Sequence, residues 1–546
     1  MLDNTRGLYV AHSENGPISL EGRMACRHGL IAGATGTGKT VTLQVLAETF
    51  CQAGVPCFMA DMKGDLSGIS QAGRLSGFIE KRLREFGIEN PQFQGCPVRF
   101  FDVYGKQGHP MRTTISRMGP EMLGRLMDLN ETQTGVLNIV FRVADDNGLL
   151  LIDLKDLRAM LNFVGQNAAE YTTQYGNVTQ ASIGAIQRAL LALENQGAEQ
   201  FFGEPDFDIY DLLQCEQGKG IMNVLAADKL MLQPKLYSTF LLWLLSELYA
   251  TLPEVGEMDL PKLVFFFDEA HMLFEGTSKA LTDKIEQVIR LIRSKGVGIW
   301  FITQSPTDIP SNILGQLGGR VQHALRAYSP QDQKAVKVAA DTFRPNPAFK
   351  TYDTLLELGT GEALVSFLDA KGTPAMVERA KILFPLSQIG AISEEQRADL
   401  VKRSRLFGRY DHPIDRESAY ELITRATEEA ERQKAEIEAA AEAEKQAAIQ
   451  AKADAKAAKE AEKAAKEAAK KRSNGIGAKV LRSVLTAVTG VAAAAVADTV
   501  TSKVTGAKKS TSKTTTTQKA VKKATKSATT TLTKELTRSI LGNLIK

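Results

Sequence analysis

The fold of this chain is decided by residues 33–40, which read Gly33-Ala34-Thr35-Gly36-Thr37-Gly38-Lys39-Thr40. This is the pattern G-x-x-x-x-G-K-T, in which backbone N–H groups surround the phosphates of a nucleotide. The glycines let the loop turn these N–H groups inward without interference from a Cβ atom. Lys39 can reach the β- and γ-phosphates, and the Thr40 hydroxyl is suited to ligate Mg²⁺. The motif therefore predicts a site for a nucleoside triphosphate with Mg²⁺.

The residues around this loop indicate an α/β fold. An apolar run at 29–32 is typical of a buried strand, and residues 41–47 follow as a helix whose positive end would face the phosphates. Short apolar strands alternate with helical stretches, which predicts a mainly parallel sheet with helices on both faces. We expect further strands at 57–60, 263–267 and 298–303, a helix at 330–341, and a hairpin of 362–369 and 374–382 turning at Lys371-Gly372.

Composition divides the chain into four parts. Residues 1–395 carry the α/β pattern, with a largely helical insertion expected at about 105–250. A connecting helical segment is expected at 396–424, and an Ala/Glu/Lys-rich helix at 425–472. Residues 473–546 form a basic tail that is expected to be disordered over its Thr/Ser/Lys-rich stretch and to end in an amphipathic helix.

The two C-terminal parts differ in what they can contact. Ile437 and Ile449 are the large apolar residues of the 425–472 helix, so it lacks a coiled-coil seam and favours a solvated single helix over an oligomerisation rod. From Ser473 onward the chain has 13 Lys or Arg and 2 Asp or Glu, a net charge of +11, whereas residues 1–472 carry a net −7. The tail is therefore either a solubilising extension or a contact for nucleic acid, a membrane surface or a partner protein.

Two acids follow the most apolar strand of the chain, Leu263-Val264-Phe265-Phe266-Phe267. Carboxylates at the C-terminal edge of a buried parallel strand stand where open α/β sheets bind ligands. Asp268 is expected to hold the Mg²⁺ shell, and Glu269 to orient and polarise the water that attacks the γ-phosphate. His271 either senses the γ-phosphate or caps the turn.

Another strand, 298–303, ends in Gln304. If this strand lies beside the phosphate loop, the Gln304 amide can hydrogen-bond the γ-phosphate or the attacking water; the alternative is a surface amide. Before this strand, a helix with one apolar face ends near Arg290 and Arg293.

The run Arg293-Ser294-Lys295-Gly296-Val297-Gly298-Ile299-Trp300-Phe301-Ile302-Thr303-Gln304-Ser305-Pro306 resembles the HerA branch of the HerA/FtsK P-loop ATPases. Residues 27–40 and 61–68 look most like bacterial YjgR-type HerA-like proteins. The resemblance covers about residues 5–390. It implies a RecA-like P-loop fold and an ATP-hydrolysing ring, a homo-hexamer, that moves along DNA. It also implies that Arg293 is an arginine finger inserted into the neighbouring subunit's site; the alternative is a cation at a helix C-terminus.

The same residues also allow other functions. Asp268-Glu269-Ala270-His271 also suggests a two-domain DEAH-type helicase, although no second nucleotide-binding lobe follows. A motor that translocates protein at a membrane and a non-motor nucleotide switch or scaffold are further alternatives. Five cysteines without metal-site spacing and an N-terminus interrupted by Asp3, Glu14 and Glu21 predict a cytoplasmic protein with reduced thiols.

Overall fold

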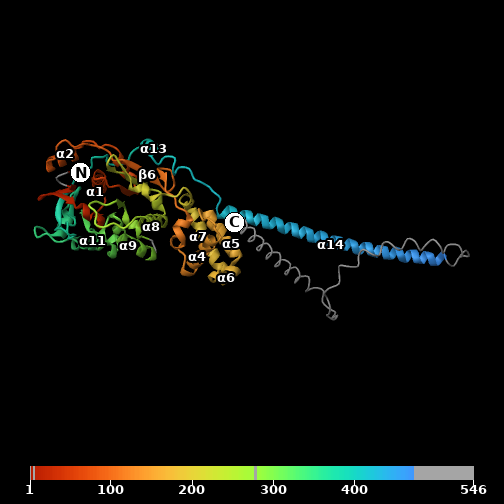
Figure 1. Ribbon diagram of the computed structural model, residues 1–546. Helices are drawn as coiled ribbons and strands as arrows, with labels where there is room; N and C mark the ends of the chain where they lie inside the picture. Colours follow the sequence, from red (N-terminus) through yellow and green to blue (C-terminus); the bar gives the residue numbers. More distant parts are fainter. Residues whose placement is uncertain (1, 4–6, 276–278, 473–546) are drawn as a thin grey trace. The chain divides into compact units, whose positions relative to one another are not determined.

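The computed structural model describes residues 2–3, 7–275 and 279–472. The chain divides into two compact units, Met1–Glu421 and Leu422–Lys546. The first unit contains the sheet and the helices packed on it (Figure 1). The predicted basic tail at 473–546 and its terminal helix lie outside the described residues.

Eight neighbouring strands of the main sheet are parallel, in the spatial order β13-β4-β12-β11-β5-β10-β6-β7. Strand β4, which leads into the phosphate loop, therefore lies between β13 and β12. Strand β11, which the two acids follow, lies on the other side of β12. The prediction of an α/β, RecA-like P-loop fold with a mainly parallel sheet is confirmed. The bounds are β4 (Gly29–Ala32), β5 (Cys57–Asp61), β6 (Val98–Asp102), β7 (His109–Pro110), β10 (Met222–Ala226), β11 (Leu263–Phe267), β12 (Val297–Thr303) and β13 (Gly319–His323).

Antiparallel strands extend this sheet beyond β13. The predicted hairpin is present as β14 and β15, and its turn is closed by a hydrogen bond from Gly372 N to Asp369 O at 2.8 Å. Strand β2 then pairs with β15, and β1 and β3 pair with β2. The bounds are β1 (Leu2–Asp3), β2 (Gly7–Ser13), β3 (Gly16–Leu20), β14 (Glu362–Ser366) and β15 (Glu378–Ile382), and a separate two-stranded sheet contains β8 (Cys215–Glu216) and β9 (Lys219–Gly220).

Trp300 is the largest side chain at the centre of the sheet, and it is fully buried. It lies on β12 opposite Gly29 of β4 in register. A Cβ atom at Gly29 would lie 2.4 Å from the indole, and one at Gly319 would lie 2.7 Å from it. The glycines that begin β4 and β13 therefore make room for the indole, and the three strands that position the phosphate loop pack around one aromatic side chain.

Helices cover the sheet and follow the predicted alternation. The helix after the phosphate loop, α1 (Lys39–Gln52), is buried along most of its length, and the predicted helix at 330–341 is α11 (Pro330–Asp341). The other α-helices of this part are α2 (Gly77–Phe86), α8 (Pro234–Thr251), α9 (Lys279–Ile292), α10 (Ser311–Leu314), α12 (Thr351–Glu357) and α13 (Glu394–Arg403). Short 3₁₀ helices are η1 (Gly22–Arg27), η2 (Asp65–Ser70), η3 (Ala198–Gln200), η4 (Ile209–Leu213), η5 (Leu230–Leu232), η6 (Ala270–Leu273), η7 (Arg293–Lys295) and η8 (Pro306–Asp308).

The range 105–250, expected to be a largely helical insertion, contains helices α3 to α7, of which α4, α5, α6 and α7 lie together in Figure 1. Side-chain caps begin several of them, for example Asn130 before α4 and Asp153 before α5. The same range also contains β10, which lies in the parallel sheet between β5 and β6. The helices are α3 (Ile115–Leu126), α4 (Glu131–Asp146), α5 (Leu154–Gln166), α6 (Ala168–Tyr175) and α7 (Gln180–Asn195).

The Ala/Glu/Lys-rich helix expected at 425–472 lies within α14 (Ala419–Arg472). Residues 404–418 before it form turns and loop, so the segment expected to connect as helix at 396–424 is only partly helical. Ile437 is 47% exposed and Ile449 is 67% exposed, as the absence of an apolar seam predicts. Among the described residues, no helix has the length and the apolar character needed to cross a membrane.

Candidate nucleotide site

The phosphate loop, Gly33–Thr40, connects β4 to α1. Gly36 and Gly38 adopt φ angles of 78° and 113°, which residues with a Cβ atom rarely adopt. A Cβ atom at Gly33 would lie 2.5 Å from the Cβ of His323. Because α1 begins at Lys39, its free N–H groups and positive dipole end face the loop, as anion binding requires.

Three backbone hydrogen bonds attach the loop to neighbouring parts of the sheet. Gly33 N donates to Thr303 O at 3.3 Å at the end of β12, and Ala34 N donates to Ala324 O at 2.9 Å just after β13. Thr37 O accepts from Gly361 N at 2.9 Å, just before β14. The loop is therefore held in a phosphate-binding shape by three different strands.

Lys39 lies against the loop itself. Its ammonium donates to Gly33 O at 2.7 Å and to Ala34 O at 3.1 Å. Burial lowers the pKa of Lys39, and the negative charges of Glu269 and Asp268 partly offset that effect. The lysine charge therefore lies close to both acids that follow β11, as phosphate and metal chemistry in one site requires.

Asp268 and Thr40 are the residues that fit a Mg²⁺ ion. Asp268 directly follows β11 and is 6% exposed; burial, together with the charge of the neighbouring Glu269, raises its pKa to about 6. Thr40 lies in the first turn of α1. A carboxylate and a hydroxyl are the oxygen ligands that Mg²⁺ prefers, and a buried carboxylate gains most from a cation beside it. A bound Mg²⁺ would neutralise charge on the phosphates.

Glu269 is the most constrained side chain of the site. Its backbone has φ 46°, in the left-handed region that a glutamate rarely occupies, and its N–H donates to Asp268 Oδ1 at 3.0 Å. The side chain is 9% exposed, and its Oε1 accepts a hydrogen bond from Lys63 Nζ at 2.6 Å. Burial raises the pKa of Glu269, but the hydrogen bond and charge of Lys63 outweigh it, so the pKa is below its ordinary value. The carboxylate is therefore held ionised.

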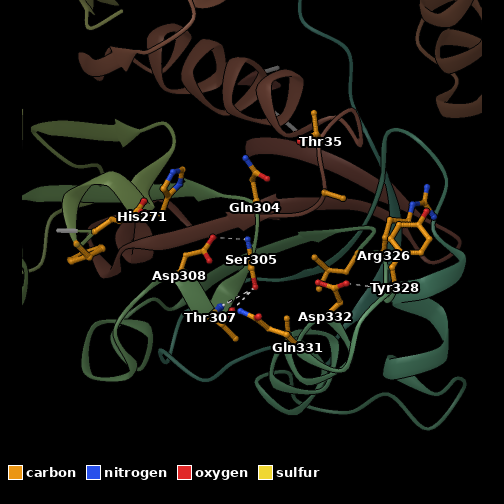
Figure 2. A pocket seen from close by; sticks show the side chains of 15 residues that line it. Thr35, His271, Gln304, Ser305, Thr307, Asp308, Arg326, Tyr328, Gln331 and Asp332 are labelled. Atoms are coloured by element: carbon orange, nitrogen blue, oxygen red, sulfur yellow. Dashed lines mark hydrogen bonds between the residues drawn. The ribbon is translucent and has the colours of Figure 1, made fainter. Parts of the chain in front are cut away.

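Gln304 and His271 lie beside the other oxygen of Glu269. Gln304 Nε2 is 3.5 Å from Glu269 Oε2, and His271 Nδ1 is also 3.5 Å from that atom. Both side chains line a pocket of about 900 Å³ that also contacts Ala34 and Thr35 of the phosphate loop. Figure 2 shows His271 at one end of this pocket, Arg326 and Tyr328 at the other, and Gln304 between them. Gln304 thus lies between the phosphate loop and Glu269, where its predicted role places it.

Arg293 lies elsewhere. It follows α9 in η7, just before the first residue of β12, whereas Gln304 follows the last residue of the same strand. Strand β12 has seven residues, which corresponds to roughly 20 Å at about 3.3 Å per residue. Arg293 therefore cannot reach the phosphate loop of its own chain, and the structure does not bring it together with Lys39, Asp268, Glu269 and Gln304.

The surroundings of Arg293 are strongly basic. Arg293 is exposed, and its guanidinium has no hydrogen bond or ion pair within residues 7–275 and 279–472. It lines a pocket of about 690 Å³ together with three other arginines, Arg27, Arg290 and Arg320, and one acid, Glu286. The Nη1 atom of Arg320 is buried there without a hydrogen-bond partner among the described residues. Apart from the ion pair of Arg27 with Glu257 at 4.0 Å, the arginines of this pocket have no acidic partner among the described residues, so its excess positive charge suits an anion.

Sequence reasoning did not identify Lys63 or His323 as parts of the site. Lys63 lay within the stretch 61–68 that carried the resemblance, but nothing local indicated its contact with a glutamate 206 positions further along the chain. His323 is buried behind the phosphate loop, where its Nε2 lies 2.8 Å from Thr42 Oγ1 and its Nδ1 2.9 Å from Glu362 O. An isolated histidine at the end of a strand carries no signal for such a role.

Comparisons with known proteins identify several similar chains. The DNA double-strand break repair helicase HerA of Sulfolobus acidocaldarius is 32% identical over 99 residues, which cover 18% of this chain and 19% of that protein. The bacterial conjugative coupling protein TrwB matches with 15% identity and a TM-score of 0.46, covering 69% of this chain and 89% of TrwB. VirB4 of Thermoanaerobacter pseudethanolicus matches with 15% identity and a TM-score of 0.44, covering 70% of this chain and 97% of that one.

The family model described as "Helicase HerA-like C-terminal" matches residues 7–495, which include the phosphate loop, the acids after β11 and Gln304. The match spans most of the chain, and it confirms the resemblance carried by residues 293–306. It also favours this family over a two-domain DEAH-type helicase. This chain belongs to the HerA-like helicase C-terminal family of P-loop ATPases.

Proposed function

We propose that this protein hydrolyses ATP as a ring-forming motor, a homo-hexamer that moves along DNA. One observation carries the proposal: Lys39, Asp268, Glu269 and Gln304 meet at the phosphate loop, whereas Arg293 lies unpaired at the opposite edge of the sheet. A hydrolytic site that lacks its arginine in one chain can be completed by a second chain.

Within one subunit, each residue of the site has a separate role in hydrolysis. The N–H groups of the loop and Lys39 bind the β- and γ-phosphates, and Thr40 and Asp268 would hold Mg²⁺. Glu269 orients the attacking water and accepts a hydrogen bond from it, and Gln304 binds the water or the γ-phosphate. Positioning and electrostatic stabilisation supply most of the rate in phosphoryl transfer, so the anchoring of the loop to three strands contributes directly.

Between subunits, Arg293 would complete the site of a neighbour. The basic pocket around it offers several guanidinium groups to the phosphates of that neighbour's nucleotide. Positive charge near the γ-phosphate stabilises the transition state of transfer, and an arginine supplied in this way is typically worth 10³- to 10⁵-fold in rate. Hydrolysis would therefore depend on assembly.

DNA is proposed as the polymer that the ring moves along. The family assignment and the name of the Sulfolobus relative, a DNA double-strand break repair helicase, support it. The basic tail offers a second contact for DNA, for a partner protein or for a membrane surface. All five cysteines are free, which fits the cytoplasmic location that we propose.

The test is steady-state ATP turnover with duplex DNA, single-stranded DNA, RNA or no polymer, alongside the native mass of the protein. We expect a hexamer whose turnover rises severalfold with DNA. Turnover that no polymer changes would favour a non-motor switch. Stimulation by an unfolded polypeptide, without any by DNA, would favour a protein-translocating motor.

A further inference from the structure

Lys63 is a charged residue that the proposed chemistry does not yet use. It follows β5, the strand directly beside β11, and the pairing of Phe267 with Ala60 brings the ends of both strands to the same edge of the sheet. Its ammonium lies 2.6 Å from Glu269 Oε1, while the lysine side chain is 56% exposed and the glutamate 9% exposed. A half-exposed cation therefore compensates a nearly buried carboxylate, which would be costly to bury alone.

The loop that carries Lys63 is rigidly built. The two carboxylate oxygens of Asp61, which is 1% exposed, accept hydrogen bonds from Gly64 N at 2.8 Å and from Leu66 N at 3.2 Å. Gly64 adopts φ 76°, which permits the tight turn immediately after Lys63. The backbone on both sides of Lys63 is thus fixed, and its ammonium is supplied from a preorganised position rather than from a mobile loop.

The two oxygens of Glu269 have different roles in this arrangement. Oε1 makes the short hydrogen bond with Lys63, whereas Oε2 has, among the described residues, two longer contacts, each 3.5 Å, with Gln304 and His271. Contacts of 3.5 Å are weak as hydrogen bonds, so Oε2 remains able to accept a hydrogen bond from a water molecule. The backbone of Glu269, with φ 46°, requires such external support because it is strained.

We propose that Lys63 is a positioning residue: it anchors Oε1 of Glu269 and thereby directs Oε2 toward the water that attacks the γ-phosphate. This inference rests on the proposed function, since it takes Glu269 as the residue that activates the water. Lys63 touches neither substrate nor metal in this role. Its removal should slow turnover while leaving nucleotide affinity intact.

The experiment measures kcat, KM and the affinity for a non-hydrolysable ATP analogue in Lys63→Met, Lys63→Gln and Lys63→Arg proteins. We expect kcat of Lys63→Met to fall about 10- to 100-fold, because small errors in the position of a catalytic group cost that much. Analogue affinity should stay within about threefold of the wild type. Lys63→Arg should recover part of kcat, because it can still donate to Oε1.

Lys235→Met is the matched control, since Lys235 is also half-exposed and forms an ion pair with Asp128, and neither residue is assigned to the nucleotide site. It should leave kcat unchanged. Melting temperatures of all variants show whether the proteins are folded, and Lys63→Gln replaces Lys63→Met if the latter is not. A wild-type or raised kcat in a folded Lys63 variant overturns the proposal, and so does a loss of analogue affinity, which would make Lys63 a phosphate contact.

A double-mutant comparison separates this inference from the proposed function. If Lys63 acts through Glu269, then Lys63→Met should have no further effect on turnover in a Glu269→Gln background. Equal effects of Lys63→Met in both backgrounds overturn the positioning role. If Glu269→Gln itself turns over ATP at the wild-type rate, the assignment of Glu269 fails, and the proposed mechanism fails with it.

Discussion

The Nδ1 atom of His28 accepts a hydrogen bond from the backbone N–H of Ile299 at 3.0 Å. Its Nε2 lies 2.9 Å from Ile289 O, so the neutral ring donates there and connects η1 and β4 with β12 and α9. His28 is 4% exposed, and burial lowers its pKa to about 4. Protonation would remove the acceptor on Nδ1 and place a charge in the core beside the arginine pocket.

We therefore expect the protein to lose stability in acid partly through His28. A folded-state pKa of about 4 against an ordinary value of 6.5 means that the unfolded chain binds the proton more readily. The contribution of neutral His28 to the free energy of unfolding is complete above pH 6.5. It is lost as the pH falls toward 4, to a limit of about 3 kcal/mol. His28→Asn removes the titratable ring at this position, where the backbone has φ 56°. The melting temperature of this variant should fall less than that of the wild type between pH 7 and pH 5. An equal fall in the melting temperatures of both proteins would contradict this prediction.

The packing of Gly29 against Trp300 gives a second prediction. A Cβ atom at Gly29 would lie 2.4 Å from the indole, so Gly29→Ala must displace the strand or the ring. Overpacking of this kind costs about 1–3 kcal/mol or more, and the melting temperature should fall accordingly. Gly77→Ala is the control, because a Cβ atom there meets no atom within 4 Å. Equal melting temperatures for the two variants would show that the centre of the sheet accommodates the added methyl group, and would contradict the prediction.

Glu269→Gln and Lys39→Ala should fail in different ways. Glu269→Gln removes the charge that polarises the water, so turnover should fall about 10²- to 10³-fold while ATP still binds. Lys39→Ala removes a phosphate contact, and the affinity for nucleotide itself should fall. Equilibrium binding of ATP to both proteins, measured beside turnover, distinguishes them. A Glu269→Gln protein with wild-type turnover would contradict the role of this glutamate.

Deleting residues 473–546 should affect DNA binding more than catalysis. The deletion removes a net charge of +11, and each lost contact with a phosphate reduces both affinity and its dependence on salt. Basal ATP turnover should be retained, because every residue assigned to the nucleotide site lies before residue 473. The measurement is duplex DNA affinity at several salt concentrations. Equal affinity of both proteins at low salt would leave the tail without a role in nucleic-acid binding.

Much of this fold could be predicted because its strands are short, apolar and buried on both faces. The strand 263–267 was predicted with the bounds that β11 has, since five consecutive apolar residues end abruptly at Asp268. Strand β10 was missed inside the helical range: its sequence, Met222–Ala226, includes Asn223, whose amide is buried and donates to Cys57 O at 3.1 Å. The same amide also donates to Leu212 O at 3.1 Å, and these contacts, which the strand's own sequence does not indicate, make a polar residue acceptable there.

The candidate site was predictable to the extent that its residues follow strands. Thr40, Asp268, Glu269 and Gln304 could be placed because parallel strands end at one edge of the sheet. The contact between Lys63 and Glu269 could not be predicted, because it depends on β5 and β11 being neighbours and on a turn stabilised by Asp61. The four arginines of this pocket, Arg293 included, come from η1, α9, η7 and β13, and only the folded chain brings them together.

Whether one subunit completes the site of another is decided by the ATP turnover of Arg293→Ala, measured beside its native mass and its affinity for a non-hydrolysable ATP analogue. We expect a ring of wild-type mass, analogue affinity within about threefold of the wild type, and turnover lower by about 10³-fold or more. Arg188→Ala, which removes an exposed arginine from α7, should behave as the wild type. A wild-type protein that is monomeric under assay conditions, hydrolyses ATP at full rate and is unaffected by Arg293→Ala would contradict the account.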